Sequence, residues 1–74
     1  MLLSELSSGQ KARIIKISGA AAVTARLLDM GVVGGTVLEL IRKAPLGDPL
    51  EIKIRNFLLS LRKAEANIIQ VEPL

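Results

Sequence analysis

Short runs in which apolar and polar residues alternate recur along the chain, and they predict five β-strands. The clearest run covers residues 50–55, where three apolar residues alternate with three charged ones. The inward residues predicted for this strand are Leu50, Ile52 and Ile54, and those predicted for the next are Phe57, Leu59 and Leu61. The predicted strands cover residues 11–17, 36–43, 50–55, 57–61 and 68–71.

The hydrophobic period changes between the first and second of these strands. From Ala20 to Met30 the apolar residues recur at helical spacing, with Val23, Leu27 and Met30 on one face. Gly31 follows at the position of a left-handed helix cap. The pattern predicts one helix over residues 20–30, long enough to plug an open end of a small barrel.

Turns and loops separate the remaining elements. Gly34-Gly35 predicts one turn, and Arg55-Asn56 a tight hairpin in which Asn56 takes the left-handed conformation. Residues 44–49 form a proline-containing loop, residues 62–67 a helical turn at most, and Pro73 ends the last strand. The prediction is a mostly β domain over residues 1–74, a small five-stranded SH3-like barrel with one helix inserted between its first and second strands. An open α+β sheet is the alternative.

Composition narrows the class of protein. Half of the residues are hydrophobic, yet only Phe57 is aromatic, so the predicted core is aliphatic. There is no Cys and no His, which excludes disulfides and the usual zinc sites. The N-terminus has neither the basic start nor the apolar stretch of a signal peptide, and no segment is long enough to span a membrane. We therefore expect a cytoplasmic protein that does not insert into the membrane.

Chemistry-bearing side chains are sparse, and we expect no enzyme and no bound cofactor. The most common general base and the strongest nucleophile are both missing. Five carboxylates fit solvated positions: Glu5, Glu39, Glu51, Glu65 and Glu72. Asp29, Asp48 and Glu51 could offer oxygens to a hard cation, but they lack the spacing of a calcium loop, so no metal site is predicted.

Net charge leaves nucleic acid open as an alternative partner. Ten basic and seven acidic residues give a net charge of +3. Arg42, Lys43, Arg55 and Arg62 could contact a phosphate backbone. A single Phe cannot build the stacking platform of a single-strand binder, so nucleic acid is the less favoured partner. Pairing of an exposed strand edge with a second copy would give a weak homo-oligomer.

Several segments together resemble one known family. They are Arg26-Leu-Leu-Asp-Met-Gly31, Gly34-Gly-Thr-Val37, Ala44-Pro-Leu-Gly-Asp-Pro49 and Leu58-Leu-Ser-Leu-Arg-Lys63 followed by Glu65-Ala66. In this order and spacing they resemble the FeoA family of small cytoplasmic proteins from bacterial ferrous-iron uptake. Many relatives have Gly-Leu-x-Pro-Gly where this chain has Gly31-Val-Val-Gly-Gly35.

The resemblance implies an SH3-like barrel and an accessory role for the membrane transporter FeoB, through the transporter's cytoplasmic GTP-binding domain. It implies neither catalysis nor a defined metal site. The same barrel forms the C-terminal domain of metal-dependent repressors of the diphtheria-toxin-repressor type, which is a further alternative.

The residues suggest two partner-binding segments. One is the proline-stiffened loop formed by Ala44, Pro45, Leu46, Gly47, Asp48 and Pro49, with Leu46 at its tip. The other is the helix, where Leu28 lies off the core-facing stripe. The alternative is that Leu46 folds back onto the barrel and that Leu28 packs under the N-terminal residues.

Overall fold

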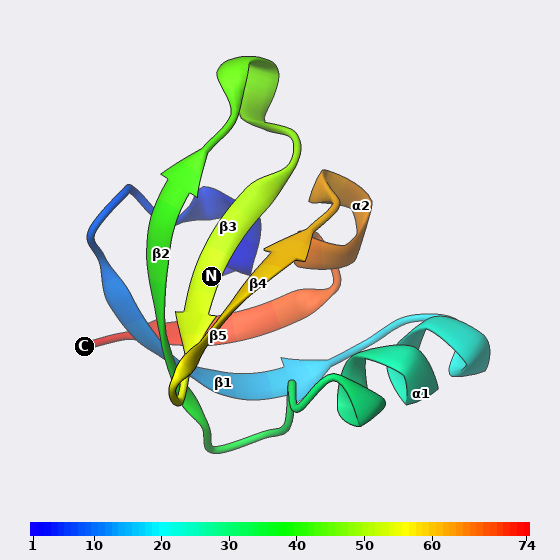
Figure 1. The fold of residues 1–74 in the computed structure, drawn as a ribbon. Coiled ribbons are helices and arrows are strands. Elements are labelled where there is room, and N and C mark those ends of the chain that lie inside the picture. Colours follow the sequence, from blue (N-terminus) through cyan, green and yellow to red (C-terminus); the bar gives the residue numbers. More distant parts are fainter.

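The computed structural model describes all 74 residues, and its elements follow the predicted order (Figure 1). Five strands, two α-helices and two short 3-10 turns alternate along the chain. The strands are β1 (Lys11–Ile17), β2 (Val37–Lys43), β3 (Leu50–Ile54), β4 (Phe57–Leu61) and β5 (Ile69–Pro73). The helices are α1 (Ala21–Asp29) and α2 (Lys63–Ala66), and the 3-10 turns are η1 (Leu3–Glu5) and η2 (Pro45–Gly47).

All five strands belong to one antiparallel sheet in the order β4-β3-β2-β1-β5. The pairing does not close into a ring, so β4 and β5 are edges and the sheet is a strongly curled, SH3-like one. The register shifts in β1 between Ile14 and Lys16 and in β2 between Leu40 and Arg42. Such irregularities bend a strand, which is how short strands wrap around a small core.

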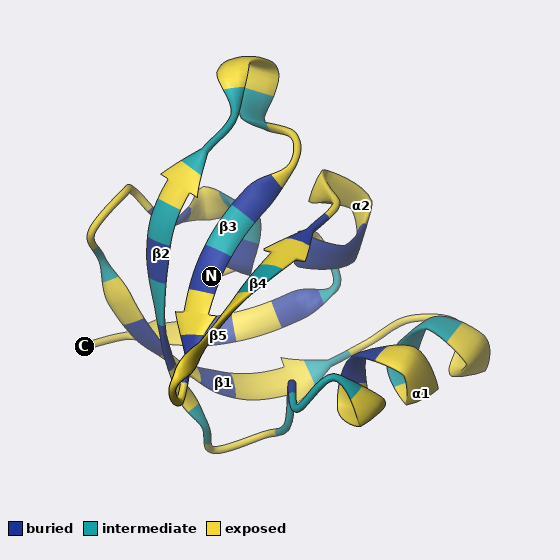
Figure 2. Ribbon diagram, viewed as in Figure 1, coloured by how far each residue is buried: buried dark blue, intermediate teal, exposed yellow.

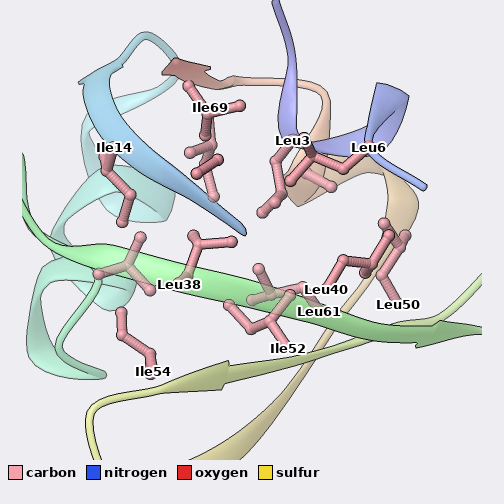
Figure 3. Close-up of a cluster of buried hydrophobic side chains, with 14 of the residues drawn as sticks. Leu3, Leu6, Ile14, Leu38, Leu40, Leu50, Ile52, Ile54, Leu61 and Ile69 are labelled. Atoms are coloured by element: carbon pink, nitrogen blue, oxygen red, sulfur yellow. The ribbon is translucent and has the colours of Figure 1, made fainter. Parts of the chain in front are cut away.

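The core lies inside the curl and is entirely aliphatic (Figure 3). The inward residues predicted for β3, Leu50, Ile52 and Ile54, are all buried, and Ala12 and Ile14 of β1 join them. Along β3 the buried residues alternate with more exposed ones, as Figure 2 shows by its change of colour. Burial of aliphatic side chains supplies about 1.5–3 kcal/mol each, which is the main stabilising contribution in a domain without disulfides.

The two ends of the core are covered by different segments. Leu27 of α1 is fully buried in the core, and Val23 and Met30 pack against it, so the predicted stripe does face the core. Leu3, the first residue of η1, and Leu6, which follows η1, lie with Leu40, Leu50 and Leu61 at the other end (Figure 3). The N-terminal segment is therefore part of the core, a role that the sequence pattern did not indicate.

Backbone contacts fix the N-terminal segment to β5. The amino group of Met1 donates to the carbonyl oxygen of Val71 at 3.1 Å, and the carbonyl oxygen of Met1 accepts from the Val71 amide at 2.7 Å. Leu2 forms an isolated bridge with Gln70. Part of the β5 edge is thus covered, whereas no segment of the chain pairs with the outer edge of β4.

Three local predictions were wrong. Phe57 was predicted to lie in the core. It is on the same face of the sheet as Ile54, its buried partner in the ladder, but it is itself 42% exposed, at the start of an edge strand. In the β3–β4 turn Arg55, not Asn56, has the positive φ, at 56°. The last strand was predicted to end at Val71 but extends to Pro73, which does end it, at an edge where a missing amide donor breaks no ladder bond.

None of the helices combines the length and the apolar character that a membrane crossing requires.

Candidate functional site

The loop between β2 and β3 projects from the top of the molecule as drawn in Figure 1. Its ends are joined by a hydrogen bond from the Ala44 amide to the Pro49 carbonyl oxygen at 3.0 Å. Inside it, the Gly47 amide donates to the Ala44 carbonyl oxygen at 2.8 Å. Asp48 anchors the loop to α2, since its carboxylate accepts from the Lys63 amide at 3.1 Å. These contacts give the loop a defined shape.

Leu46 at the tip of this loop is 98% exposed, so it does not fold back onto the barrel. Its φ is 72°, in the left-handed region, and Gly47 beside it has a φ of 77°. A left-handed residue with a Cβ costs about 1–2 kcal/mol, and an exposed Leu gains no packing energy in return. The fold gives no reason for Leu at this position, which leaves binding as the physical reason to consider.

The second predicted segment, the end of α1, carries an exposed apolar pair. Leu28 is 51% exposed, so it does not pack under the N-terminal residues. Gly31, two residues beyond α1, has a φ of 92° and lies under the ring of Phe57, whose Cζ would be 3.4 Å from a Cβ placed there. Leu28 and Phe57 therefore lie at the same end of α1, and Phe57 is a surface residue that the sequence pattern placed in the core.

The loop tip and the end of α1 do not form one surface. Figure 1 shows the loop at the top of the molecule and α1 at its lower right, beyond β1. The structure thus separates Leu46 from Leu28, and a partner that touched both would have to extend along the whole domain.

Glu65 was predicted to be solvated, and it is buried instead. One carboxylate oxygen accepts from the Arg62 amide at 2.9 Å, which caps the start of α2. The other forms an ion pair with the guanidinium of Arg26 on α1. One oxygen thus has a hydrogen bond and the other has only the charge of the Arg26 guanidinium beside it, and the pair ties α1 to the body of the domain. Arg62 is not one of the residues that mark a helix start, so the sequence offers only Glu65 at the third helical position as a signal for the cap.

Candidate metal ligands do not converge. No group of three or more His, Cys, Asp or Glu side chains is arranged to hold a metal ion. Asp48 is engaged by the Lys63 amide, and Asp29 lies on the exposed side of α1. The surfaces of this domain offer apolar and charged contacts.

Comparison with known proteins identifies the family. The family model described as the FeoA domain matches residues 1–73. This chain belongs to the FeoA family. A relative from Porphyromonas gingivalis, named as a fusion of Fe(2+) transport protein A with the Fe(2+) transporter FeoB, is 39% identical over 72 residues. The match covers 97% of this chain but only 8% of that fusion protein.

Solved structures of FeoA proteins agree with the fold. FeoA from Chlorobium tepidum is 43% identical with a TM-score of 0.92, over 100% of this chain and 70% of that one. FeoA from Stenotrophomonas maltophilia, described as an SH3 domain protein and solved with zinc, is 29% identical with a TM-score of 0.83. That match covers 97% of this chain and 89% of the other. The predicted SH3-like architecture is confirmed.

The similarity to metal-dependent repressors is a similarity of fold. A manganese-dependent transcriptional repressor matches 100% of this chain with a TM-score of 0.92, but at 16% identity and over 41% of its own length. The FeoA-like fold therefore occurs as part of a larger regulator, as the sequence resemblance implied, and this match says nothing further about what the present chain binds.

Proposed function

We propose that this chain is a non-enzymatic accessory protein of bacterial ferrous-iron transport that acts at the cytoplasmic face by binding a FeoB-type membrane transporter. The observation that carries the proposal is the fusion relative, in which a domain 39% identical to this chain shares one polypeptide with FeoB. Covalent linkage raises the effective concentration of one domain at the other, and its gain is largest when the two associate.

We further propose that the partner is the transporter's cytoplasmic GTP-binding domain and that the loop of residues 44–49 docks on it. Leu46 supports this choice, because it is an exposed apolar side chain on a loop whose shape is already fixed. A preorganised loop loses little conformational entropy on binding, so its apolar tip contributes most of its burial energy to affinity. Leu28 at the end of α1 is a second contact point.

The test is a binding measurement between the purified chain and both the whole transporter and its isolated cytoplasmic domain, by calorimetry or surface plasmon resonance. We expect Leu46→Asp to weaken binding by about tenfold or more, because it places a charge where apolar surface is buried. Leu28→Asp should weaken it as well. Binding to the whole transporter but not to its cytoplasmic domain would contradict the choice of partner domain and keep the accessory role.

Leu74→Asp is the matched control, since Leu74 is also exposed but lies at the C-terminal end, away from both segments. It should bind as the unmodified protein does. All three variants change exposed side chains, so their melting temperatures should stay close to that of the parent. No binding of the unmodified protein to either form of the transporter would overturn the proposed function.

A further inference from the structure

The outer face of the sheet carries a hollow of ≈ 270 Å³ where the first half of β2 runs between β1 and β3. We call it the basic hollow. Its charged members come from three strands, Lys11 from β1, Glu39 from β2 and Lys53 from β3, with Arg55 just after β3. Val37 and Leu38 complete the lining.

The cations of the basic hollow have no partner within the chain. Glu39 is directly opposite Lys11 in one ladder and Lys53 in the other. The chain nevertheless has only two ion pairs, Arg13–Glu72 and Arg26–Glu65, and neither involves Lys11, Lys53 or Arg55. Three exposed cations around one half-buried carboxylate give the hollow a net charge of +2, against +3 for the whole chain. Most of the net charge is thus concentrated on one face.

The spacing of these cations selects for a ligand with several separated negative charges. Lys53 and Arg55 are alternate residues, so their Cα atoms lie about 7 Å apart. Lys11 and Lys53 are on the two strands that flank β2, which separates them by about 10 Å. A compact anion would pair with all three cations only if their flexible side chains converged on it against their mutual repulsion. A chain of carboxylates can pair with each cation where it lies.

Apolar groups lie between and beside the cations. Val37 is 41% exposed within the hollow, and Leu58, opposite Lys53 in the β3–β4 ladder, is 60% exposed. A phosphodiester backbone has no group that covers these side chains, and the face has no aromatic platform for bases. A second copy is disfavoured because an isologous contact would bring the same positive charges together. A polypeptide segment that carries both acidic and apolar side chains matches the face.

We propose that the basic hollow, with Leu58 at its rim, is a binding site for an acidic segment of a protein partner in which carboxylates alternate with aliphatic residues. The charges steer the segment to the sheet, and Val37 and Leu58 bury its apolar side chains. The proposal is independent of the transporter, since it follows from the charge and exposure of this face alone.

The experiment is an NMR titration of the isotope-labelled chain with a short synthetic peptide of glutamate, leucine and glycine. We expect the amide signals around Lys11, Val37 and Lys53 to shift, and the signals of the loop at residues 44–49 to stay in place. A peptide with glutamine in place of glutamate should produce no such shifts. The affinity should fall as salt is added, because the contacting charges are exposed.

The double variant Lys53→Glu, Arg55→Glu should weaken peptide binding by about tenfold or more. Its matched control is Lys16→Glu, Lys63→Glu, which makes the same change in net charge at exposed residues outside the hollow and should bind normally. Equal weakening by both variants would mean a response to net charge and would overturn the site. Tighter binding of a single-stranded oligonucleotide or of phosphatidylserine vesicles than of the peptide would overturn the choice of ligand.

Discussion

The guanidinium of Arg26 on α1 pairs with the buried carboxylate of Glu65 on α2, and no other ion pair joins these two helices. Glu65 also caps α2 by accepting from the Arg62 amide. The pair lies in a small groove of ≈ 170 Å³ lined by both helices, with Val23 and Ile68 as neighbours. The position of α1 on the domain therefore depends on a polar contact as well as on the burial of Leu27.

Removal of Glu65 should cost more stability than removal of Arg26. Glu65→Ala deletes both the cap and the ion pair, and we expect it to lower the free energy of unfolding by about 1–2 kcal/mol. Arg26→Ala leaves the cap intact, and because Arg26 is largely exposed its loss should cost at most about 1 kcal/mol. Urea denaturation measures both. Asp29→Ala, an exposed acidic residue on α1, is the control, and a larger cost for Arg26→Ala than for Glu65→Ala would contradict this ranking.

Shortening the buried side chains of the N-terminal segment to alanine should destabilise the whole domain. Leu3 and Leu6 are fully buried, and Leu→Ala changes in a core cost about 2–5 kcal/mol. A chain of this size has a total stability of about 4–11 kcal/mol, so either change removes a large share of it. Leu2→Ala, at a more exposed neighbouring residue, should cost much less. Thermal unfolding followed by circular dichroism measures the three melting temperatures. Equal melting temperatures would contradict the prediction.

Two neighbouring residues in the loop tip should respond in opposite directions. Leu46→Gly removes the strain of a left-handed residue with a Cβ, which should raise the free energy of unfolding by about 1–2 kcal/mol. The greater freedom of Gly in the unfolded chain should lower it by about 0.5–1 kcal/mol. Its melting temperature should stay level or rise. Gly47→Ala introduces the same strain without any clash, since no atom lies within 4 Å of the new Cβ. Its melting temperature should fall by about 4–8 °C for each kcal/mol lost.

The same Leu46→Gly variant separates stability from binding. If Leu46 is present for a partner, this variant should bind the FeoB-type transporter about tenfold more weakly while it unfolds no more easily than the parent. Unchanged affinity in a protein of unchanged stability would remove the loop tip from the docking surface.

Gly31→Ala should be destabilising through the backbone. The φ of 92° at Gly31 is one that residues with a Cβ rarely adopt, and we expect a cost of about 1–2 kcal/mol. The nearest atom, Cζ of Phe57, is at ordinary contact distance. The cost should therefore remain when Gly31→Ala is made together with Phe57→Ala. Recovery of stability in the double variant would show that crowding against the ring was the cause.

The period of the hydrophobic pattern was sufficient to predict much of the fold. The predicted bounds of β1 and β4 match the structure, and those of β2 and β3 differ by one residue at one end. Those of α1 differ by one residue at each end, and β5 begins one residue later and ends two residues later than predicted. Leu50, Ile52 and Ile54 are buried as expected because a central strand has neighbours on both sides. The predicted burial of Phe57 was wrong because alternation indicates which face a residue is on but not how far other segments cover that face.

Tertiary contacts decided what the pattern could not. Leu3 and Leu6 are too few to show a period, and only the folded sheet reveals that they cover one end of the core. The unpaired state of Lys11, Lys53 and Arg55 depends on strand register, which one sequence does not specify. Leu46 was predicted as a contact point from its place at the tip of a proline-stiffened loop, and Leu28 from its place off the core-facing stripe of α1. Both side chains are exposed, and their use in binding stays a prediction.

The two edges of the sheet differ in how far they are protected from pairing with a strand of another molecule. Along β5, Met1 and Leu2 occupy part of the edge and Pro73 offers no amide hydrogen, so a foreign strand finds few free partners there. No segment covers the edge at β4, and this strand carries the exposed Phe57 and Leu58. Any pairing with a strand from another molecule, whether in a crowded cell or a concentrated sample, should therefore begin at β4, because part of the edge at β5 is already occupied.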